Sequence, residues 1–327
     1  MIVVSIGCPS GVGPEVSVAA AAKLRGVTTI LVGEERTILA AAELRGVSRR
    51  RFARFDGLRR TDRILIHDPG IALTERQRAP GRPTARAGAA ELAWIDAGFE
   101  LARGVRAALV TGPVSKAIIA RSGAPGGARF RGHTEHLRAR DGARESVMCF
   151  VAPKLATSLV TTHLPLARVP RALDARGVAS ATVWLARLLT RLGKSSPRLA
   201  VASLNPHAGE SELLGKEEHH AILPGIRAAR RTLGRRARIA GPVGAETAYR
   251  LAYAGIYDGV VAMYHDQATI PMKLVAFGEA VNVTMGLSVP RTSVDHGTAY
   301  DIAWRGEADP RGMLEAMQLG ERLCARD

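Results

Sequence analysis

Short apolar runs alternate with longer, often Ala-rich stretches along this chain, and this alternation limits the possible fold more than any other feature. Runs with the length and composition of buried strands include residues 2–6, 28–32, 107–110, 199–204 and 259–263. Stretches with the length of helices include residues 14–24, 87–103, 178–192 and 310–326. Strands that alternate with helices predict an α/β fold with a largely parallel sheet.

Three of the apolar runs are each followed by a histidine. His163 comes after residues 158–162, and His207 and His265 come shortly after the runs at 199–204 and 259–263. Ligands bind at the carboxyl ends of parallel strands, and three imidazoles there suit Zn²⁺ or another divalent ion. The spacing matches no local metal motif, so the alternative is three unrelated loop histidines.

A second group of polar residues has the chemistry of an anion site. Lys273, Asn282 and Arg291 recur at intervals of nine across a predicted loop and strand. A lysine, a planar guanidinium and neutral donors together fit a phosphate group. His133 and Thr134 open a predicted helix, where free N–H groups also favour an anion. The alternative for any one of these residues is simple exposure to solvent.

Composition excludes several classes of protein. The formal net charge is +16, but only six of the 46 basic residues are lysines, and the arginines are scattered without an aromatic-interleaved stripe. We therefore expect small-anion binding rather than nucleic-acid binding. Cys8, Cys149 and Cys324 are too widely spaced for a disulfide framework or a zinc finger, which fits a reducing cytoplasm. No apolar run approaches the roughly 20 residues of a membrane span.

Several longer motifs identify a family. They are GCPSGVGPE at 7–15, VTGPVSKA at 110–117, GHTEHL at 132–137, TTHLPL at 161–166, NPHAGE at 205–210, YHDQ at 264–267, PMK at 271–273 and VPRTSVDHGTAYDIA at 289–303. Within the last, residues 295–303 resemble the nucleotide loop of the β-decarboxylating dehydrogenases, which bind NAD without a GxGxxG turn. Over nearly its whole length the chain resembles the 4-hydroxythreonine-4-phosphate dehydrogenase family of pyridoxal phosphate biosynthesis.

The resemblance implies an architecture and an assembly. The fold is α/β and two-lobed, similar to isocitrate and isopropylmalate dehydrogenases, with mostly parallel sheets and a cleft between the lobes. We expect residues 1–130 plus 300–327 in the first lobe and 131–299 in the second. The family forms homodimers whose active sites are shared, and no membrane or nucleic-acid partner is implied.

The resemblance also assigns roles to residues. It implies one divalent ion per subunit (zinc, magnesium or cobalt) on His163, His207 and His265. It implies that the phosphorylated substrate binds to His133, Thr134, Lys273, Asn282 and Arg291. We place NAD on the loop residues Asp295, His296, Gly297, Thr298 and Asp301.

The implied reaction is NAD-dependent oxidation of 4-phosphohydroxy-L-threonine at C3, followed by decarboxylation to 3-amino-2-oxopropyl phosphate. Candidate proton acceptors are His207, Glu246 and Asp266. Cys8 and Glu246 depart from the family pattern, which has an acid and an aspartate there, so the alternative substrates are 4-phosphothreonate and 4-phosphoerythronate. Alternatives of another class are a metal-dependent phosphatase, which does not need the 295–303 loop, and a non-catalytic phosphometabolite-binding protein.

Overall fold

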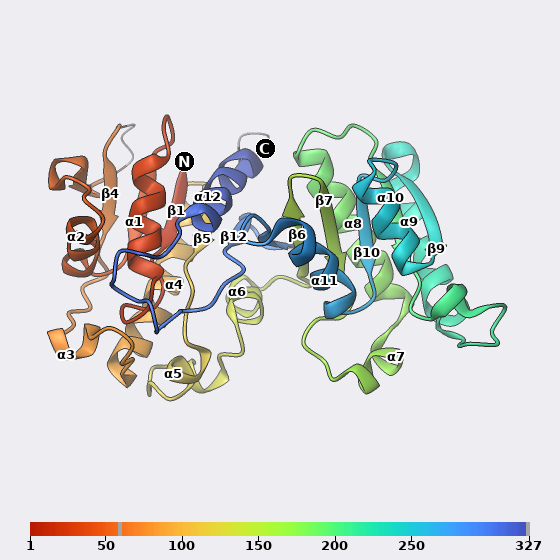
Figure 1. The fold of residues 1–327 in the computed structure, drawn as a ribbon, viewed down its shortest axis with the longest axis horizontal. Helices are drawn as coiled ribbons and strands as arrows, with labels where there is room; N and C mark the ends of the chain where they lie inside the picture. The colour runs from red at the N-terminus through yellow and green to blue at the C-terminus, as the bar shows by residue number, and fades with distance from the viewer. Residues whose placement is uncertain (58–60, 325–327) are drawn as a thin grey trace. The chain divides into compact units, whose positions relative to one another are not determined.

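The structure is a computed structural model that describes residues 1–57 and 61–324 (Figure 1). It divides into two compact units: unit 1 contains Met1–Ser146 and Leu287–Asp327, and unit 2 contains Val147–Gly286. The sequence placed these boundaries near 130 and 300. The structure differs by keeping residues 131–146, which include the helix that begins at His133, and residues 287–299, which include the strand that carries Arg291, in unit 1.

Unit 1 contains a fully parallel six-stranded arrangement. Its strands are β1 (Ile2–Ser5), β2 (Thr29–Val32), β3 (Phe52–Arg54), β4 (Ile64–His67), β5 (Ala108–Thr111) and β12 (Arg291–Ser293). They lie in the order β3-β4-β2-β1-β5-β12, and each neighbouring pair is parallel. The central strands are buried on both faces, which explains why their sequences are continuous apolar runs.

Helices cover both faces of this sheet. They are α1 (Gly13–Lys23), α2 (Glu35–Leu44), α3 (Glu75–Arg78), α4 (Ala85–Gly104), α5 (Lys116–Ala120), α6 (His133–Asp141) and α12 (Arg311–Cys324). Helices α1 and α12 pack together on one face, while α4 packs against β1, β2 and β5 on the other (Figure 1). Helix α4 lies close to the sheet because small residues lie at the contacts. A Cβ at Gly98 of α4 would lie 3.3 Å from Leu109 Cδ1 of β5.

Unit 2 contains a mixed sheet. Its strands are β6 (Val147–Ala152), β7 (Leu155–Leu159), β8 (Arg198–Ala202), β9 (Arg238–Val243), β10 (Gly259–Ala262) and β11 (Val281–Met285), in the order β11-β6-β7-β10-β8-β9. Strand β6 is antiparallel to both β7 and β11 and forms a hairpin with β7, whereas β7, β10, β8 and β9 are parallel. The α/β class and the largely parallel pairing are therefore confirmed.

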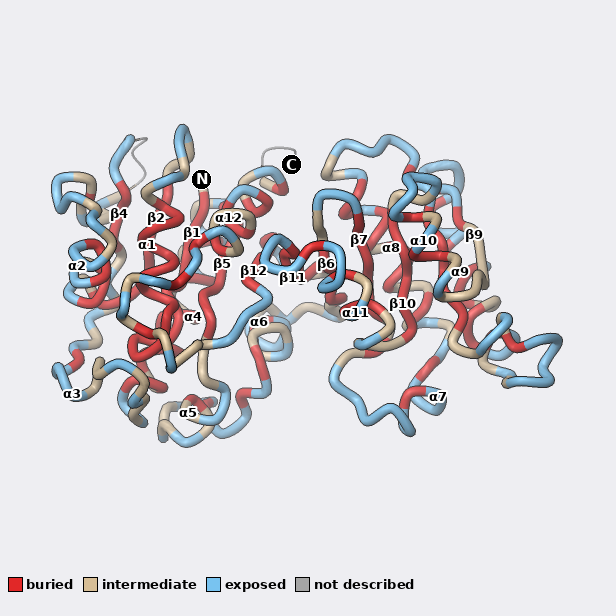
Figure 2. Tube along the Cα trace, in the orientation of Figure 1, coloured by how far each residue is buried: buried red, intermediate tan, exposed pale blue. Residues whose placement is uncertain are grey.

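The helices of unit 2 are α7 (Val169–Ala172), α8 (Ala175–Arg191), α9 (Leu223–Leu233), α10 (Ala245–Tyr253) and α11 (His265–Ala276). Helices α10 and α11 enclose one apolar core against the sheet, in which Phe150, Tyr249 and Met272 are buried. Figure 2 shows the strands of each unit as buried and the outer turns of the helices as exposed. No described helix has the length and apolarity that a membrane crossing requires.

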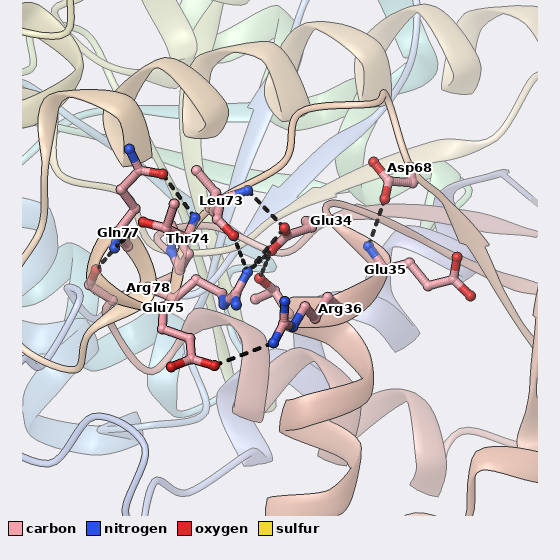
Figure 3. A network of polar contacts seen from close by, with 12 residues as sticks. Glu34, Glu35, Arg36, Asp68, Leu73, Thr74, Glu75, Gln77 and Arg78 are labelled. Atoms are coloured by element: carbon pink, nitrogen blue, oxygen red, sulfur yellow. Dashed lines mark hydrogen bonds and ion pairs between the residues drawn. The ribbon is translucent and has the colours of Figure 1, made fainter.

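The end of β2 is held by a polar network around Glu34 (Figure 3). This buried carboxylate accepts hydrogen bonds from Arg78 Nη1 at 2.9 Å and from the Leu73 N–H at 2.8 Å. Thr74 and Gln77 cap α3 reciprocally, so the short helix that carries Arg78 is itself fixed. The network ties the segment after β4 to the carboxyl end of β2.

Candidate active site

The Gly-rich turn after β1 is the point where three segments of unit 1 meet. Cys8 N–H donates to the Pro113 carbonyl at 2.9 Å, and Val12 N–H donates to the Thr298 carbonyl at 3.0 Å. A Cβ at Gly11 would lie 2.7 Å from that same carbonyl oxygen, so a side chain there would force the segments apart. The glycines of this turn therefore serve close packing against the loop that carries residues 295–301.

That loop is anchored just beyond its end by Glu15, a fully buried residue at the start of α1. Its carboxylate accepts hydrogen bonds from the Trp304 N–H at 2.8 Å and the Gly306 N–H at 3.1 Å, and Arg45 lies 3.7 Å away. Burial raises the pKa of Glu15 despite these partners. The side chains expected to hold a nucleotide, Asp295 and His296, remain exposed.

Two of the expected phosphate ligands come together inside unit 1. Arg291, on β12, is only 4% exposed, and its Nε and Nη2 donate to Thr111 Oγ1 at 3.0 and 2.6 Å. The Nε2 atom of His133, at the start of α6, is buried and has no hydrogen-bond partner among the described residues. Arg291 is close enough for its charge to lower the pKa of His133. A buried guanidinium near a half-buried imidazole with a buried, unsatisfied nitrogen is an arrangement that an anionic ligand would complete.

The electrostatics of this pair fix its charge state. Burial lowers the pKa of His133 well below its ordinary value, and the charges of Arg291, His136 and Lys116 lower it further. The imidazole is therefore neutral near pH 7. Burial also lowers the pKa of Arg291 to about 10, which leaves the guanidinium charged at the same pH. A phosphate would thus meet one formal charge and one neutral ring.

Two of the three histidines expected to bind metal come together in unit 2. Strands β7 and β10 are parallel neighbours, and their pairing continues past both strands because Thr161 N–H donates to the Met263 carbonyl at 3.1 Å. The rings of His163 and His265 consequently lie 5.5 Å apart, centroid to centroid. His265 Nδ1 is 2.7 Å from Asp266 Oδ1, the kind of carboxylate contact that orients metal-binding imidazoles.

The third histidine does not join this pair in the structure. His207 lies in the turn Pro206–Gly209 after β8, and its φ is 52°, in the left-handed region. Ala208 shares this conformation, which costs on the order of 1–3 kcal/mol per non-Gly residue. Within residues 1–57 and 61–324 no three His, Cys, Asp or Glu side chains lie close enough to hold a metal. The three-histidine centre remains a prediction.

Of the remaining expected substrate residues, Thr134 follows His133 at the start of α6 in unit 1, whereas Lys273 and Asn282 lie in unit 2. Lys273 belongs to α11, although the sequence placed it in a loop, and Asn282 is on β11. The Asn282 Oδ1 atom is buried and has no partner among the described residues, so it is a second polar atom that a ligand could satisfy.

The candidate proton acceptors differ in environment. Glu246 is exposed at the start of α10, where its carboxylate accepts hydrogen bonds from Thr247 at 2.9 Å and Arg250 at 2.8 Å. These hydrogen bonds, Thr247 first, lower its pKa and make it a weaker base in this conformation. Asp266 is also exposed and contacts His265.

Helix α11 carries an apolar surface beside these polar residues. Ile270, Leu274 and Phe277, spaced four and three residues apart, are 66%, 83% and 84% exposed. Such spacing places Ile270 and Leu274 on one face of α11, with Phe277 just beyond the end of the helix. Large apolar side chains gathered at this exposure are typical of an interaction surface.

One polar cluster in unit 1 was not expected from the sequence. Glu91 of α4 is fully buried, and its Oε2 accepts a hydrogen bond from the Ser115 N–H at 2.8 Å. Cys8 lies within hydrogen-bonding reach of the carboxyl group, and its sulfur is 3.6 Å from the Tyr300 hydroxyl. The sequence feature that could have predicted this cluster is the position of Glu91 on the apolar face of α4, where Ala87 and Ile95 lie on the neighbouring turns.

Comparison with known proteins gives a consistent result. The family model described as pyridoxal phosphate biosynthetic protein PdxA matches residues 25–320. A protein of Desulfosudis oleivorans named 4-hydroxythreonine-4-phosphate dehydrogenase is 37% identical over 98% of this chain and 94% of its own length. One of the same name from Acidithiobacillus ferrooxidans is 39% identical over 97% of this chain and 94% of its own.

Solved structures extend the comparison to the fold. The crystal structure of 4-hydroxythreonine-4-phosphate dehydrogenase from Klebsiella pneumoniae has a TM-score of 0.85 at 33% identity, and each chain is covered to 99%. A terephthalate 1,2-cis-dihydrodiol dehydrogenase from Burkholderia xenovorans has a TM-score of 0.71 at 29% identity, covering 98% of this chain and 97% of its own.

Proposed function

The chain belongs to the PdxA family of pyridoxal phosphate biosynthetic proteins, and on that premise we propose that it oxidises 4-phosphohydroxy-L-threonine with NAD⁺. The proposed reaction transfers hydride from C3 and then releases CO₂, which yields 3-amino-2-oxopropyl phosphate. The observation that carries the substrate class is the pairing of buried Arg291 with the unsatisfied His133 Nε2. It supports a phosphorylated substrate rather than a neutral one.

The phosphate would be bound by unit 1 as follows. Arg291 supplies the charge, and its contact with Thr111 fixes the orientation of the guanidinium before any ligand arrives. Neutral His133, as its Nε2–H tautomer, would donate one hydrogen bond, and Thr134 beside it at the start of α6 would supply another donor. Preorganised donors cost little reorganisation on binding.

A divalent ion is proposed on His163, His265 and His207, and the first two fit because their rings already lie together. When bound, such an ion polarises a hydroxyl and stabilises negative charge on oxygen. Asp266 would hold the orientation of the His265 ring through the Nδ1 contact. His207 must reorient to join them, and its left-handed turn is the segment where that change would occur.

NAD⁺ is proposed to bind over the loop 295–301. The Gly-rich turn supports this loop through the hydrogen bond between Val12 and Thr298, and Glu15 anchors the segment after it. Exposed Asp295 and His296 are then available to the dinucleotide. This arrangement supports a dehydrogenase over a phosphatase, which has no need of a nucleotide loop.

A homodimer with shared active sites is proposed, in the cytoplasm. The support is the apolar surface of α11 formed by Ile270, Leu274 and Phe277, on the same helix as His265 and Lys273. A second copy that covers this surface would lie beside those polar residues. It would therefore be in position to contribute groups to the same site.

The test is a direct assay with purified protein, NAD⁺ and a divalent metal, in which NADH absorbance is followed. We expect turnover of 4-phosphohydroxy-L-threonine and none of its unphosphorylated form. Preference for 4-phosphothreonate would instead support the alternative substrate, which the departure at Glu246 keeps open. Phosphate release without NADH formation would refute the dehydrogenase proposal and favour the phosphatase. Binding of the phosphorylated compound without any turnover would favour a non-catalytic binding protein.

A further inference from the structure

The buried carboxyl group of Glu91 lies next to the loop proposed to receive NAD⁺ but has no part in the reaction described above. It is 0% exposed, and its Oε1 has no hydrogen-bond partner among the described residues. A buried carboxyl group with one unsatisfied oxygen is costly to a fold, by about 1–3 kcal/mol. Such a group calls for an explanation other than packing.

Its contacts lead directly to the nucleotide loop. The Oε2 atom accepts from the Ser115 N–H at 2.8 Å, and the Cys8 thiol is in reach to donate to the same carboxyl group. The Cys8 sulfur is 3.6 Å from the Tyr300 hydroxyl, which also has hydrogen-bonding contact with the side chains of Ser115 and Thr298. One cluster thus joins α4, the Gly-rich turn, the start of α5 and the loop.

The net charge of this cluster changes near neutral pH. Burial raises the pKa of Glu91 to about 7, against the hydrogen bonds from Ser115 and Cys8, which lower it. Neither of these partners is a cation, and the nearest lysine in sequence, Lys116, is exposed. Burial likewise raises the pKa of Cys8 and of Tyr300, so both remain neutral. Glu91 is therefore the member of the cluster that changes charge between pH 6 and 8.

We propose that Glu91 is a positioning residue for the dinucleotide: acting through Cys8 and Ser115, it holds Tyr300 and the loop 295–301 in the conformation that binds NAD⁺, and it does so in its protonated form. The role rests on the proposed function, because it presupposes that this loop receives NAD⁺. The charge of Glu91 decides which of its two forms favours NAD⁺ binding. NAD⁺ carries a dianionic pyrophosphate, and a buried negative charge on Glu91 beneath the loop would oppose binding of that dianion there.

The expected pH dependence follows from linkage. A group with a pKa of about 7 is about 90% protonated at pH 6 and about 10% at pH 8. If only the protonated form binds, the apparent Kd for NAD⁺ rises about 10-fold over that range, because it scales inversely with the competent fraction. NAD⁺ binding near pH 7 is accompanied by uptake of roughly half a proton.

The experiment is isothermal titration of the metal-loaded dimer with NAD⁺ at pH 6, 7 and 8, in buffers of different ionisation enthalpy. Glu91→Gln is isosteric and permanently neutral, so its Kd is expected to vary less than twofold with pH and its proton uptake at pH 7 to vanish. Glu100→Gln makes the same chemical change at an exposed position of the same helix and should behave as wild type. Tyr300→Phe, which removes the hydroxyl from the cluster, should weaken NAD⁺ binding several-fold at pH 6 as well as at pH 8.

The outcomes separate this role from the proposed function. If Glu91→Gln keeps the wild-type pH dependence and proton uptake, or if the wild-type Kd does not change with pH, the role of Glu91 is refuted while the dehydrogenase proposal stands. If the wild-type protein does not bind NAD⁺ at any pH, both are refuted. Thermal melting of Glu91→Gln without ligand shows whether the fold is intact. If the variant does not fold, the wild-type proton uptake decides, and its absence refutes the role.

Discussion

Replacement of Arg291 is the sharpest test of the phosphate site, because this residue is buried and already oriented. Its guanidinium makes two hydrogen bonds to Thr111 Oγ1 and is only 4% exposed. A hydrogen bond to a charged group contributes about 1.5–3 kcal/mol. Loss of one such bond to phosphate therefore corresponds to about a 10- to 150-fold weaker interaction.

The assay compares KM and kcat for the phosphorylated substrate in the wild type, Arg291→Gln and Arg291→Lys. We expect Arg291→Gln to raise KM by about 10- to 150-fold, and Arg291→Lys to lie between it and the wild type because the charge stays but the planar fork is lost. Arg131→Gln is the control, since Arg131 is exposed one residue before the turn into α6.

A second measurement on the same variant does not depend on turnover. The Arg291 charge lowers the pKa of His133, so Arg291→Gln should move that pKa upward, toward its ordinary value, as followed by NMR. A KM within threefold of wild type, together with an unchanged His133 pKa, would show that these residues do not form one anion site.

Three further perturbations test other parts of the structure. His163→Ala should lose most of the bound divalent metal, as measured by elemental analysis of the purified protein, and full retention would place the centre elsewhere. Gly11→Ala should lower the free energy of unfolding, measured by chemical denaturation, by about 1–3 kcal/mol, because its Cβ would lie 2.7 Å from the Thr298 carbonyl oxygen. Gly104→Ala is the matched control: its Cβ would lie in open space, so its free energy of unfolding should not fall. Leu274→Lys should shift the protein from dimer to monomer in sedimentation analysis, because it places a charge in the apolar surface of α11, and an unchanged dimer would exclude this face as the interface.

Local sequence was sufficient where neighbouring residues alone decide the structure. The run at 259–263 became β10, and His265 follows it at the start of α11. The hairpin of β6 and β7 is equally local, since two short apolar runs lie a few residues apart. Such elements depend on period and chain reach, which the sequence states directly.

Local rules failed at Lys273. The sequence placed Lys273 in a loop, and Pro271, two residues earlier, removes a hydrogen bond wherever it stands inside a helix. In the structure the helix continues through it, with Ala268 and Met272 buried in the core of unit 2. Tertiary packing there outweighs the local cost of proline, and no pattern within the segment reveals that balance.

The sequence by itself determined the α/β class, the family and the chemical character of the candidate residues, because strand and helix periods and side-chain types are local properties. Only the tertiary structure decided which of those residues meet. Arg291 and His133 are distant in sequence, yet in unit 1 the charge of Arg291 lowers the pKa of His133. Glu91 keeps its proton near neutral pH because folding buries it, against the hydrogen bonds from Ser115 and Cys8. Burial and the charges of distant segments set these pKa values, and both arise only when the chain folds.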